Sequence, residues 1–587
     1  MSAWPKISAN GRGRRLTVVA ILALLQAIAA GVSAIAMRET FAALGNPGQG
    51  SLPVLSVAVI TAAAALLALF RWQERVLAEQ IGQEFAGSLR LQLFKHIARL
   101  PADELAKRRV GGLSLRFVGD LTAIREWVSR GITRLLSAAI VIPVVWFVLV
   151  HINAELAMAA LPPIMVGLIL MALAGLPLMA AHRRLRSRRS RLSAGVTERL
   201  PHASELRLLG RLSKESTQIR RNTEHMIAAA LERQRLAVLI RVVPDIMAGI
   251  ALAAMLWVAL SKPVPAAETA GAIAAMGMMV QKMRELGSVW NRYCAWNTAK
   301  KRCMALLSVR PLPQKRRQPG NRSEKQFTAQ MSPGVHIRLA QVQLDEQICV
   351  DARVSPGEKI GLIGPNGCGK SRLLQLIAGM QRPAAGSIRI DGEQAISWAG
   401  VSAKRVLYLG PHSPILAGSL RRSLTLGLAR RPKDSVIEET AALYGLTAVI
   451  RRLGGIEGRI AENGRNLSAG ELRRILLARA ALLQPDLLLL DDPAASLDAE
   501  GKQLVRQLIE AIPGTVLITA PEKNQLPRVD TLWQLENGAF TVEDMRIPTR
   551  RPLALLISPS QKPDLCPELP DHSYAAALGG AALYSLN

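Results

Sequence analysis

Six long apolar segments, separated by polar ones, dominate the first half of the chain. Each can cross about 30 Å of hydrocarbon as a helix, the last only if its helix continues past the apolar run. The first could instead be a secretory signal, because small residues stand at 33–36. Its run is too long for a signal core, however, and a second segment follows closely. We therefore predict a membrane domain of six helices, at residues 16–37, 52–72, 132–150, 156–181, 236–260 and 269–280.

The polar segments between these spans alternate in length. Those at 73–131 and 182–235 are long and periodic, so they are expected to be helices that extend the spans beyond the membrane. In the first of them, apolar residues recur on one helical face at Leu89, Leu93, Phe94 and Ile97. The three short segments contain only two cations, Arg38 and Lys262.

Lys and Arg outnumber Asp and Glu by 74 to 44, a formal net charge of +30. Such a charge raises a soluble nucleic-acid translocase as an alternative. The cations, however, gather in the two long polar segments, for example at Arg183, Arg184, Arg188 and Arg189. By the positive-inside rule, these segments and both termini face the cytoplasm. We therefore predict an integral protein of the cytoplasmic (inner) membrane, surrounded by membrane lipid, with no nucleic acid as a partner.

Beyond the spans the pattern becomes that of an α/β domain, in which short β-rich runs alternate with helices. The five cysteines show no metal-ligand spacing, which fits a reduced setting. We predict a cytoplasmic N-terminal segment at 1–15, the transmembrane domain at 16–308, a polar, Pro-containing linker at 309–333, the α/β domain at 334–545 and an unassigned tail at 546–587.

A phosphate-binding loop lies near the start of the α/β domain. A predicted strand at 359–363 is followed by G-x-x-x-x-G-K-S and then by a helix at 372–378. In this setting backbone N–H groups surround the β-phosphate, Lys370 reaches the β- and γ-phosphates, and the Ser371 hydroxyl holds Mg²⁺. We therefore predict a P-loop α/β fold that binds ATP and Mg²⁺. The loop residues are Gly364, Pro365, Asn366, Gly367, Cys368, Gly369, Lys370 and Ser371.

Two acidic residues follow a fully apolar strand in the second half of the α/β domain. The strand at 487–490 is expected to be buried on both faces, as parallel strands are. Asp491 and Asp492 follow it, at the edge of the sheet where α/β domains bind ligands. Asp491 is therefore predicted as a magnesium ligand opposite Ser371.

The order of these motifs resembles that of the ABC ATPase family. Residues 467–471 read L-S-A-G-E, similar to the family's L-S-G-G-Q signature, and the pattern S-L-D at 496–498 follows the acidic pair. With six spans upstream in the same chain, residues 16–545 resemble an ABC exporter half-transporter. Residues 112–116 with Asp120, and residues 205–210, resemble the family's coupling regions in the cytoplasmic segments.

The resemblance implies a nucleotide site shared between two chains. In the family, each ATP lies between the phosphate loop of one chain and the signature of the other, so a dimer is required. Closure on ATP would switch the membrane cavity outward, which is alternating access. The fused domains and the short outer segments favour export. By this resemblance the nucleotide-contacting residues also include Ser468, Ala469, Gly470, Glu471 and Asp498.

Four positions depart from the family pattern. Glu usually follows the magnesium Asp; here it is Asp492, one methylene shorter, which we predict as the catalytic base. No histidine follows the strand at 515–520, Pro411 stands where a glutamine is usual, and residues 344–346 lack the aromatic that stacks on adenine. His412 could stand in for the glutamine. Displacing a catalytic group by about 1 Å can lower a rate about a hundredfold.

These departures leave two interpretations open. The chain is either a slow but competent ATPase that uses Asp492, or a chain that binds ATP and hydrolyses it poorly. The second would make it a regulatory subunit whose ATP site gates a catalytically competent half-transporter. We favour a heterodimer over a homodimer with two slow sites. The pattern does not identify the substrate, since lipids, amphipathic drugs, peptides and thiol compounds all fit.

Charged residues in the last two spans are further candidates. Lys282, Arg284 and Glu285 follow the apolar run of the last span, about 20 Å of helix from the outer surface. Charges at that depth are expected to face a water-filled cavity, unless they already lie at the inner interface. Arg241 and Asp245, four residues apart on the fifth span, could pair with each other.

Overall fold

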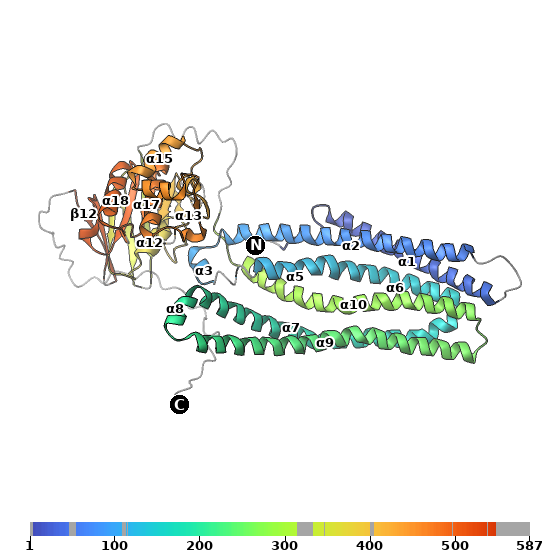
Figure 1. The fold of residues 1–587 in the computed structure, drawn as a ribbon. Helices are drawn as coiled ribbons and strands as arrows, with labels where there is room; N and C mark the ends of the chain where they lie inside the picture. Colours follow the sequence, from blue (N-terminus) through green and yellow to red (C-terminus); the bar gives the residue numbers. More distant parts are fainter. Residues whose placement is uncertain are drawn as a thin grey trace, which may run out of the picture. The chain divides into compact units, whose positions relative to one another are not determined.

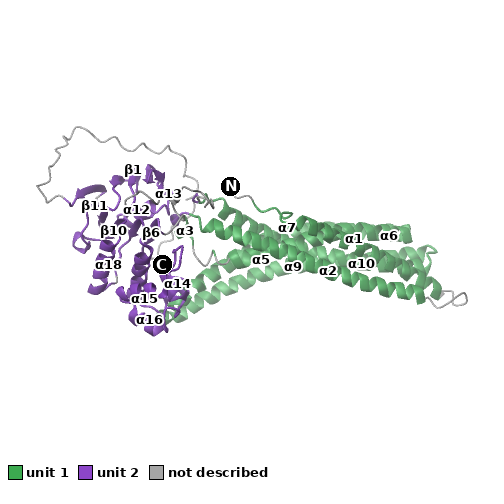
Figure 2. Ribbon diagram, turned by 90° about the horizontal axis from the view of Figure 1, so that it is seen from above, with its two compact units in different colours: residues 1–100, 104–311 green, residues 101–103, 312–587 purple. Residues whose placement is uncertain are grey.

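The computed structural model describes residues 4–45, 54–108, 113, 116–313, 333–345, 347–398, 404–411, 413–495, 497–536 and 538–546. The chain divides into two compact units (Figure 2). The first, the membrane unit, comprises residues 1–100 and 104–311; the second, the nucleotide unit, comprises residues 101–103 and 312–587. The division at 311 lies within the segment predicted to link the two domains.

The membrane unit consists of long helices that run side by side (Figure 1). Five helical segments among the described residues are long and apolar enough to cross a membrane. The sixth predicted span lies in α10, which is long but is not among those five, because charged residues follow its short apolar run. The long helices are α1 (Arg12–Gly45), α2 (Val54–Ile97), α6 (Thr133–Ile152), α7 (Ala154–Arg199), α9 (Leu212–Ser261) and α10 (Ala266–Leu307).

The two long polar segments are largely helical, as predicted. Helices α2, α7 and α9 continue through them and reach 44, 46 and 50 residues. Leu89 and Leu93 are buried, but Phe94 is 62% exposed and so does not belong to the buried face. The shorter elements of these segments are α3 (Ala102–Ala106), η1 (Arg116–Asp120), α5 (Leu121–Glu126), η2 (Trp127–Ile132), η3 (Leu200–His202) and α8 (Ala203–Leu208), of which η1 and η2 are π-helical.

The two predicted coupling regions fall in these segments. Residues 112, 114 and 115 lie outside the described residues, whereas Asp120 is buried and forms an ion pair with Arg186. In the second region, residues 205–208 belong to the exposed helix α8, and Gly210 has a φ of 66°.

Small residues allow the membrane helices to approach closely. An alanine-rich cluster around Ala27, Ala34 and Ala275 joins α1, α6, α7, α9 and α10. A Cβ atom at Gly175 on α7 would lie 2.3 Å from Trp290 Nε1 on α10, so only glycine fits there without a shift. This packing matches a composition that is 50% hydrophobic but only 4% aromatic.

The nucleotide unit is built on two larger sheets. The six-stranded sheet has the order β12-β11-β3-β10-β9-β6, and the four-stranded sheet the order β2-β1-β4-β5. In the first, β11, β3, β10, β9 and β6 are mutually parallel, and β12 is antiparallel to β11. Its strands are β3 (Lys359–Ile363), β6 (Val406–Leu409), β9 (Leu487–Leu490), β10 (Thr515–Ala520), β11 (Thr531–Glu536) and β12 (Ala539–Asp544).

The second sheet and the helices complete this unit. Its strands are β1 (Ile337–Gln343), β2 (Cys349–Val354), β4 (Ser387–Ile390) and β5 (Glu393–Gln394), and two short strands, β7 (Gly418–Ser419) and β8 (Arg459–Ile460), pair separately. The helices are α12 (Lys370–Ile377), α13 (Ala395–Trp398), α14 (Leu420–Leu424), α15 (Asp434–Leu443), α16 (Thr447–Leu453), α17 (Ala469–Leu483) and α18 (Ala499–Ala511).

The parallel pairing decides where polar side chains can meet. All four residues of β9 are buried, as predicted for a strand covered on both faces. Ile518 of β10 aligns with Leu490 of β9 and with Gly361 of β3. The carboxyl ends of β3, β6, β9 and β10 therefore meet at one edge of the sheet.

Candidate nucleotide site

The phosphate loop runs from the carboxyl end of β3 into α12, and two of its glycines are required by contacts. Gly364 has a φ of 153°, and a Cβ atom there would lie 2.2 Å from the Leu535 carbonyl oxygen. Gly369 has a φ of 100°, and its Cβ would lie 2.7 Å from Leu344 Cδ2. Side chains at these positions would force the loop outward, so the glycines keep its backbone close to the sheet.

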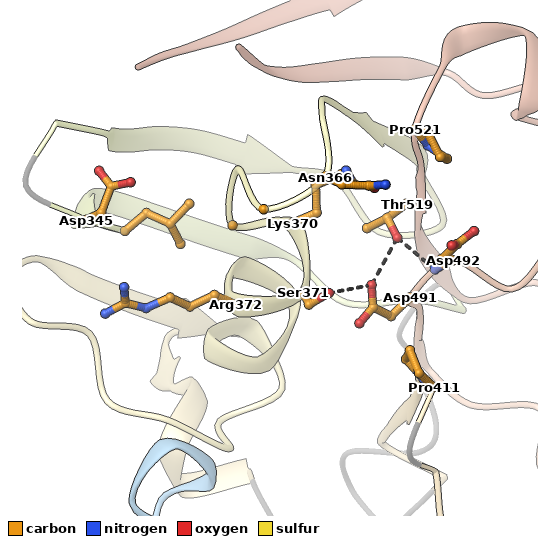
Figure 3. Close-up of a pocket in the computed structure, with 13 residues that line it drawn as sticks. Asp345, Asn366, Lys370, Ser371, Arg372, Pro411, Asp491, Asp492, Thr519 and Pro521 are labelled. Carbon is orange, nitrogen blue, oxygen red and sulfur yellow. Dashed lines mark hydrogen bonds between the residues drawn. The ribbon is translucent and has the colours of Figure 1, made fainter. Parts of the chain in front are cut away.

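Lys370 and Ser371 begin helix α12 and turn in different directions. The Lys370 ammonium donates to the carbonyl oxygens of Gly364 and Pro365, at 3.0 Å for the latter, so it lies within the loop. The Ser371 hydroxyl donates to Asp491 Oδ1 at 2.9 Å (Figure 3). The predicted pairing of Ser371 with the first acidic residue therefore exists in the structure.

Asp491 accepts hydrogen bonds from three hydroxyl groups. Besides Ser371, Thr519 Oγ1 on β10 donates at 3.2 Å and the Tyr408 hydroxyl on β6 donates at 2.8 Å. Burial raises the pKa of Tyr408 to about 12, which keeps its hydroxyl protonated and able to donate. The Asp491 carboxylate is only 3% exposed, so these donors replace the water it would otherwise bind.

Asp492 is positioned by its backbone rather than by its carboxylate. Its φ is 48°, in the left-handed region, and its N–H donates to Thr519 Oγ1 at 2.8 Å. Thr519 thus connects the two acidic residues, because it accepts from the backbone of one and donates to the carboxylate of the other. In Figure 3 the Asp492 side chain points away from Ser371.

These residues line one pocket of about 430 Å³. Gly364, Pro365 and Cys368 belong to the loop but are not among the lining side chains. Of the departures noted from the sequence, Pro411 lines the pocket without a polar group, and the position after β10 is occupied by Pro521. His412, Glu346 and Ser496 lie outside the described residues. The lining residues are Leu344, Asp345, Asn366, Gly367, Gly369, Lys370, Ser371, Arg372, Pro411, Asp491, Asp492, Thr519 and Pro521.

Two polar contributors, Thr519 and Tyr408, were not predicted from the sequence. Each belongs to a short strand that ends at the ligand-binding edge, and each is the residue before the last of its strand. The sequence feature that could have identified them is a hydroxyl-bearing residue just before the last position of a largely apolar strand.

The signature segment forms the start of helix α17 and does not line this pocket. Ser468 caps the helix: its hydroxyl accepts from the Glu471 N–H at 3.1 Å, and Glu471 accepts from the Ser468 N–H at 2.8 Å. Arg452 also donates to Glu471, at 2.8 Å. Ser468, Ala469 and Gly470 are thereby presented at a helix N-terminus, a position that favours anions.

Asp498 likewise lies outside the pocket lining. It caps helix α18 by accepting from the Gly501 N–H at 2.8 Å, and Arg474 donates to both of its oxygens. The hydrogen bond from the Gly501 N–H holds the pKa of the Asp498 carboxyl below its usual value, and the contact with Arg474 adds a smaller effect in the same direction. Within one chain, Asp498 therefore supports α18.

The residues present fit a magnesium nucleotide. The buried Asp491 carboxylate and the Ser371 hydroxyl lie 2.9 Å apart beside a glycine-rich loop. Both offer hard oxygen atoms, which are the ligands that Mg²⁺ prefers. Among the described residues no group of three His, Cys, Asp or Glu could hold a metal alone. In nucleotide sites Mg²⁺ is typically held by phosphate oxygens together with one or two protein groups.

Comparison with known families accounts for both units. The model of the ABC transporter transmembrane region matches residues 16–279, and that of the ABC transporter itself matches residues 349–495. The chain is an ABC transporter. As an ABC exporter half-transporter it carries one membrane domain and one nucleotide-binding domain in a single polypeptide, as the sequence motifs predicted.

Several relatives of this ABC transporter are similar over most of their length. An ATP-dependent lipid A-core flippase of Syntrophus aciditrophicus is 22% identical over 480 residues, 80% of this chain and 79% of the flippase. The glutathione/L-cysteine transport system protein CydC of Bacillus subtilis is 26% identical over 85% of this chain and 88% of CydC. ABC transporter 1 of Ajellomyces capsulatus is 33% identical over 198 residues, which are only 15% of that protein.

A solved structure has the same fold. A bacterial Atm1-family ABC exporter with ATP bound superposes with a TM-score of 0.77 at 18% sequence identity, covering 90% of this chain and 95% of that one. The helical membrane bundle with an α/β nucleotide-binding domain is therefore the exporter fold.

Proposed function

We propose that this ABC transporter exports a substrate from the cytoplasm or inner leaflet by alternating access, in a dimer whose ATP site formed by this chain hydrolyses slowly. ATP-driven export fits the exporter fold and relatives that are transport proteins by name. These relatives give no support to a purely regulatory subunit. The observation that carries the proposal is the Ser371–Asp491 hydrogen bond beside the glycine-rich loop, with Asp492 held next to it.

Each part of the site has a proposed task. The loop amides from Asn366 to Gly369 and the Lys370 ammonium would bind the β- and γ-phosphates, and Ser371 and Asp491 would hold Mg²⁺. The ion neutralises phosphate charge when it is bound. Asp492 would orient or deprotonate the attacking water. No aromatic side chain lines the described pocket, so Leu344 would contact adenine without stacking.

Slow hydrolysis follows from what surrounds Asp492. The backbone of Asp492 is held by Thr519, so its shorter side chain cannot move forward to make up the missing methylene. Pro411 and Pro521, which line the pocket near it, offer no side-chain donor to a water or a γ-phosphate. A catalytic base displaced by about 1 Å, with no second side chain to orient the water, lowers the rate of ATP hydrolysis about a hundredfold or more.

The site is also incomplete in a single chain. The helix-capping segment Ser468–Glu471 does not line the pocket of its own chain, which supports a second chain that contributes this element. We propose a heterodimer whose other half-transporter carries Glu after its magnesium Asp and a His after the next strand. The nucleotide unit would lie in the cytoplasm and the helices in the inner membrane, in line with the cations of the long polar segments.

Mg-ATP turnover by the purified chain tests this proposal. We expect ATP binding with turnover well below about 1 s⁻¹, and an increase of about tenfold or more in Asp492→Glu, because the longer side chain reaches the water. Lys370→Ala is the matched control; it should abolish binding of a fluorescent ATP analogue by removing a charge-assisted contact. If the chain alone turns over at several per second and Asp492→Asn stops it, the slow-site proposal is wrong.

A further inference from the structure

Two arginines of the membrane unit meet at one serine. Arg134 on α6 and Arg292 on α10 both donate to Ser288 Oγ, at 2.7 and 2.6 Å. Arg292 also donates to the Ser288 carbonyl oxygen at 3.2 Å. Across the part of the chain that the structure describes, no carboxylate oxygen lies within 4.0 Å of either guanidinium. Two like charges are thus held together between two helices without a counter-ion in contact.

Two other cations on α10 do have carboxylate partners. Arg284, on the same helix, forms an ion pair with Asp245, so the pairing of Asp245 with Arg241 expected from the sequence is wrong. Lys282 is buried, donates to Ser137 at 2.9 Å and lies 3.5 Å from Glu285. The Arg134–Arg292 pair therefore differs from Lys282 and Arg284 on α10 in lacking such a partner.

The wider surroundings contain charges of both signs. Three carboxylates lie within electrostatic range of the pair, and each has another partner: Gln26 donates to Glu74 at 2.6 Å, Lys282 lies 3.5 Å from Glu285, and Arg125 lies 4.0 Å from Glu126. The cations within the same range are Arg75, Arg130 and Arg241. These charges balance around the pair, so the two guanidiniums themselves are the excess positive charge.

The pair lies near the inner end of the membrane helices. With Ile152 and Ala266 at the outer ends of α6 and α10, Arg134 is about 27 Å and Ser288 about 33 Å from those ends at 1.5 Å per residue. The hydrocarbon core is about 30 Å thick, so the pair stands at its cytoplasmic boundary. A ligand from the cytoplasm or the inner leaflet would meet it on entry.

We propose that Arg134 and Arg292 bind a dianionic oxyanion group of the transported substrate. Each guanidinium has five N–H donors in a planar fork, and the contacts with Ser288 leave most of them available. A phosphate monoester, with a charge near −2 and three acceptor oxygens, or a pair of carboxylates, matches two adjacent forks. The assignment rests on export as proposed above. The same chemistry has two sources, a lipid headgroup or a water-soluble anion.

Equilibrium binding to the purified full-length chain in a neutral detergent tests this proposal. The probes are dioleoyl phosphatidic acid, glycerol 3-phosphate and succinate, with dioleoylglycerol as the uncharged counterpart. We expect phosphatidic acid or a soluble dianion to bind and dioleoylglycerol not to bind. Arg134→Gln and Arg292→Gln should each weaken binding about tenfold or more, because each removes charge-assisted hydrogen bonds. Arg284→Gln, a paired arginine on the same helix, is the matched control and should bind as the wild type does.

Which probes bind distinguishes a lipid headgroup from a water-soluble anion as the ligand. Binding of phosphatidic acid alone indicates a lipid cargo, and binding of glycerol 3-phosphate or succinate a soluble one. The proposal fails if no dianion binds, or if both arginine variants bind as tightly as the Arg284→Gln control. An unchanged melting temperature in detergent shows that the membrane unit of a variant is folded. Ser288→Ala, which removes the hydroxyl that both guanidiniums contact, replaces any variant that is not folded and should also weaken binding. Binding requires no turnover, so failure here leaves export itself to be judged by ATP-dependent transport.

Discussion

Asp491 shows how a single buried carboxylate is held in place by hydrogen bonds. Three hydroxyl groups from α12, β10 and β6 donate to it, and its exposed fraction is 3%. A buried acceptor that loses one donor and gains no water costs about 1–3 kcal/mol. The three donors therefore both stabilise the sheet edge and fix the orientation of the carboxylate.

Tyr408→Phe is expected to destabilise the chain by about 1–3 kcal/mol, because it removes one donor from Asp491. The measurement is calorimetric unfolding of the purified chain. Mg-ATP should reduce the difference, since bound Mg²⁺ can occupy the released oxygen. Tyr444→Phe is the control: that tyrosine is also buried, with a pKa raised by burial to about 12, but no partner of its hydroxyl is recorded among the described residues. Equal melting temperatures for the two variants would contradict the role given to Tyr408.

At the residue scale, the sequence predicts those groups whose spacing is fixed by a local motif. Ser371 and Asp491 were placed opposite each other by a glycine loop and an apolar strand, and they share a hydrogen bond. Thr519 and Tyr408 reach the site only through the strand order β10-β9-β6, which no local pattern specifies. The partner of Asp245 was wrong for the same reason, since Arg284 comes from another helix.

At the scale of elements, α7 and α10 approach closely because residue 175 of α7 is a glycine and has no side chain. Trp290 Nε1 donates to the Gly175 carbonyl oxygen, and the indole covers the space a Cβ would occupy. Gly175→Val should therefore lower the stability of the membrane unit by about 1–3 kcal/mol, the usual cost of overpacking.

Thermal unfolding in detergent measures this effect. Gly249→Val on α9 is the matched control, because a Cβ there meets nothing within 4 Å. If the two variants unfold at the same temperature, the close approach at Gly175 does not contribute to stability.

Some helices and strands have a clear pattern in the sequence, and others have none. Long periodic segments predicted α2, α7 and α9 well beyond the membrane, and an all-apolar run predicted the buried strand β9. The start of α17 at Ala469 has a signal in the sequence, because Ser468 and Glu471 have the spacing of a capping box. The π-helical turns η1 and η2 were not predicted, because a hydrophobic pattern of helical period does not distinguish a π-turn from an α-turn.

For the whole molecule, the expected assembly is a pair of different half-transporters. Mass spectrometry of the chain purified from its native membranes should find a second half-transporter in a one-to-one ratio. That partner should have Glu after its magnesium Asp and a His after the following strand, because one efficient site suffices for a cycle with one slow site. Recovery of a homodimer with full ATP turnover would contradict this prediction.

The wider turn η2 directly precedes α6, the helix that carries Arg134 of the Arg134–Arg292 pair. Its bonds span five residues rather than four, so it holds a residue that an unbroken α-helix would not. Removing one residue from Trp127–Ile132 would let an ordinary α-helical turn replace the wider one, so the helix on either side would keep its rotational phase. By contrast, removing one residue of α6 between Arg134 and Ser137 would turn one of them by about 100° relative to the other, so they would no longer both face Ser288 and Lys282 on α10. The wider turn is therefore a place where the chain ahead of α6 can lose one residue without altering which groups meet at Ser288.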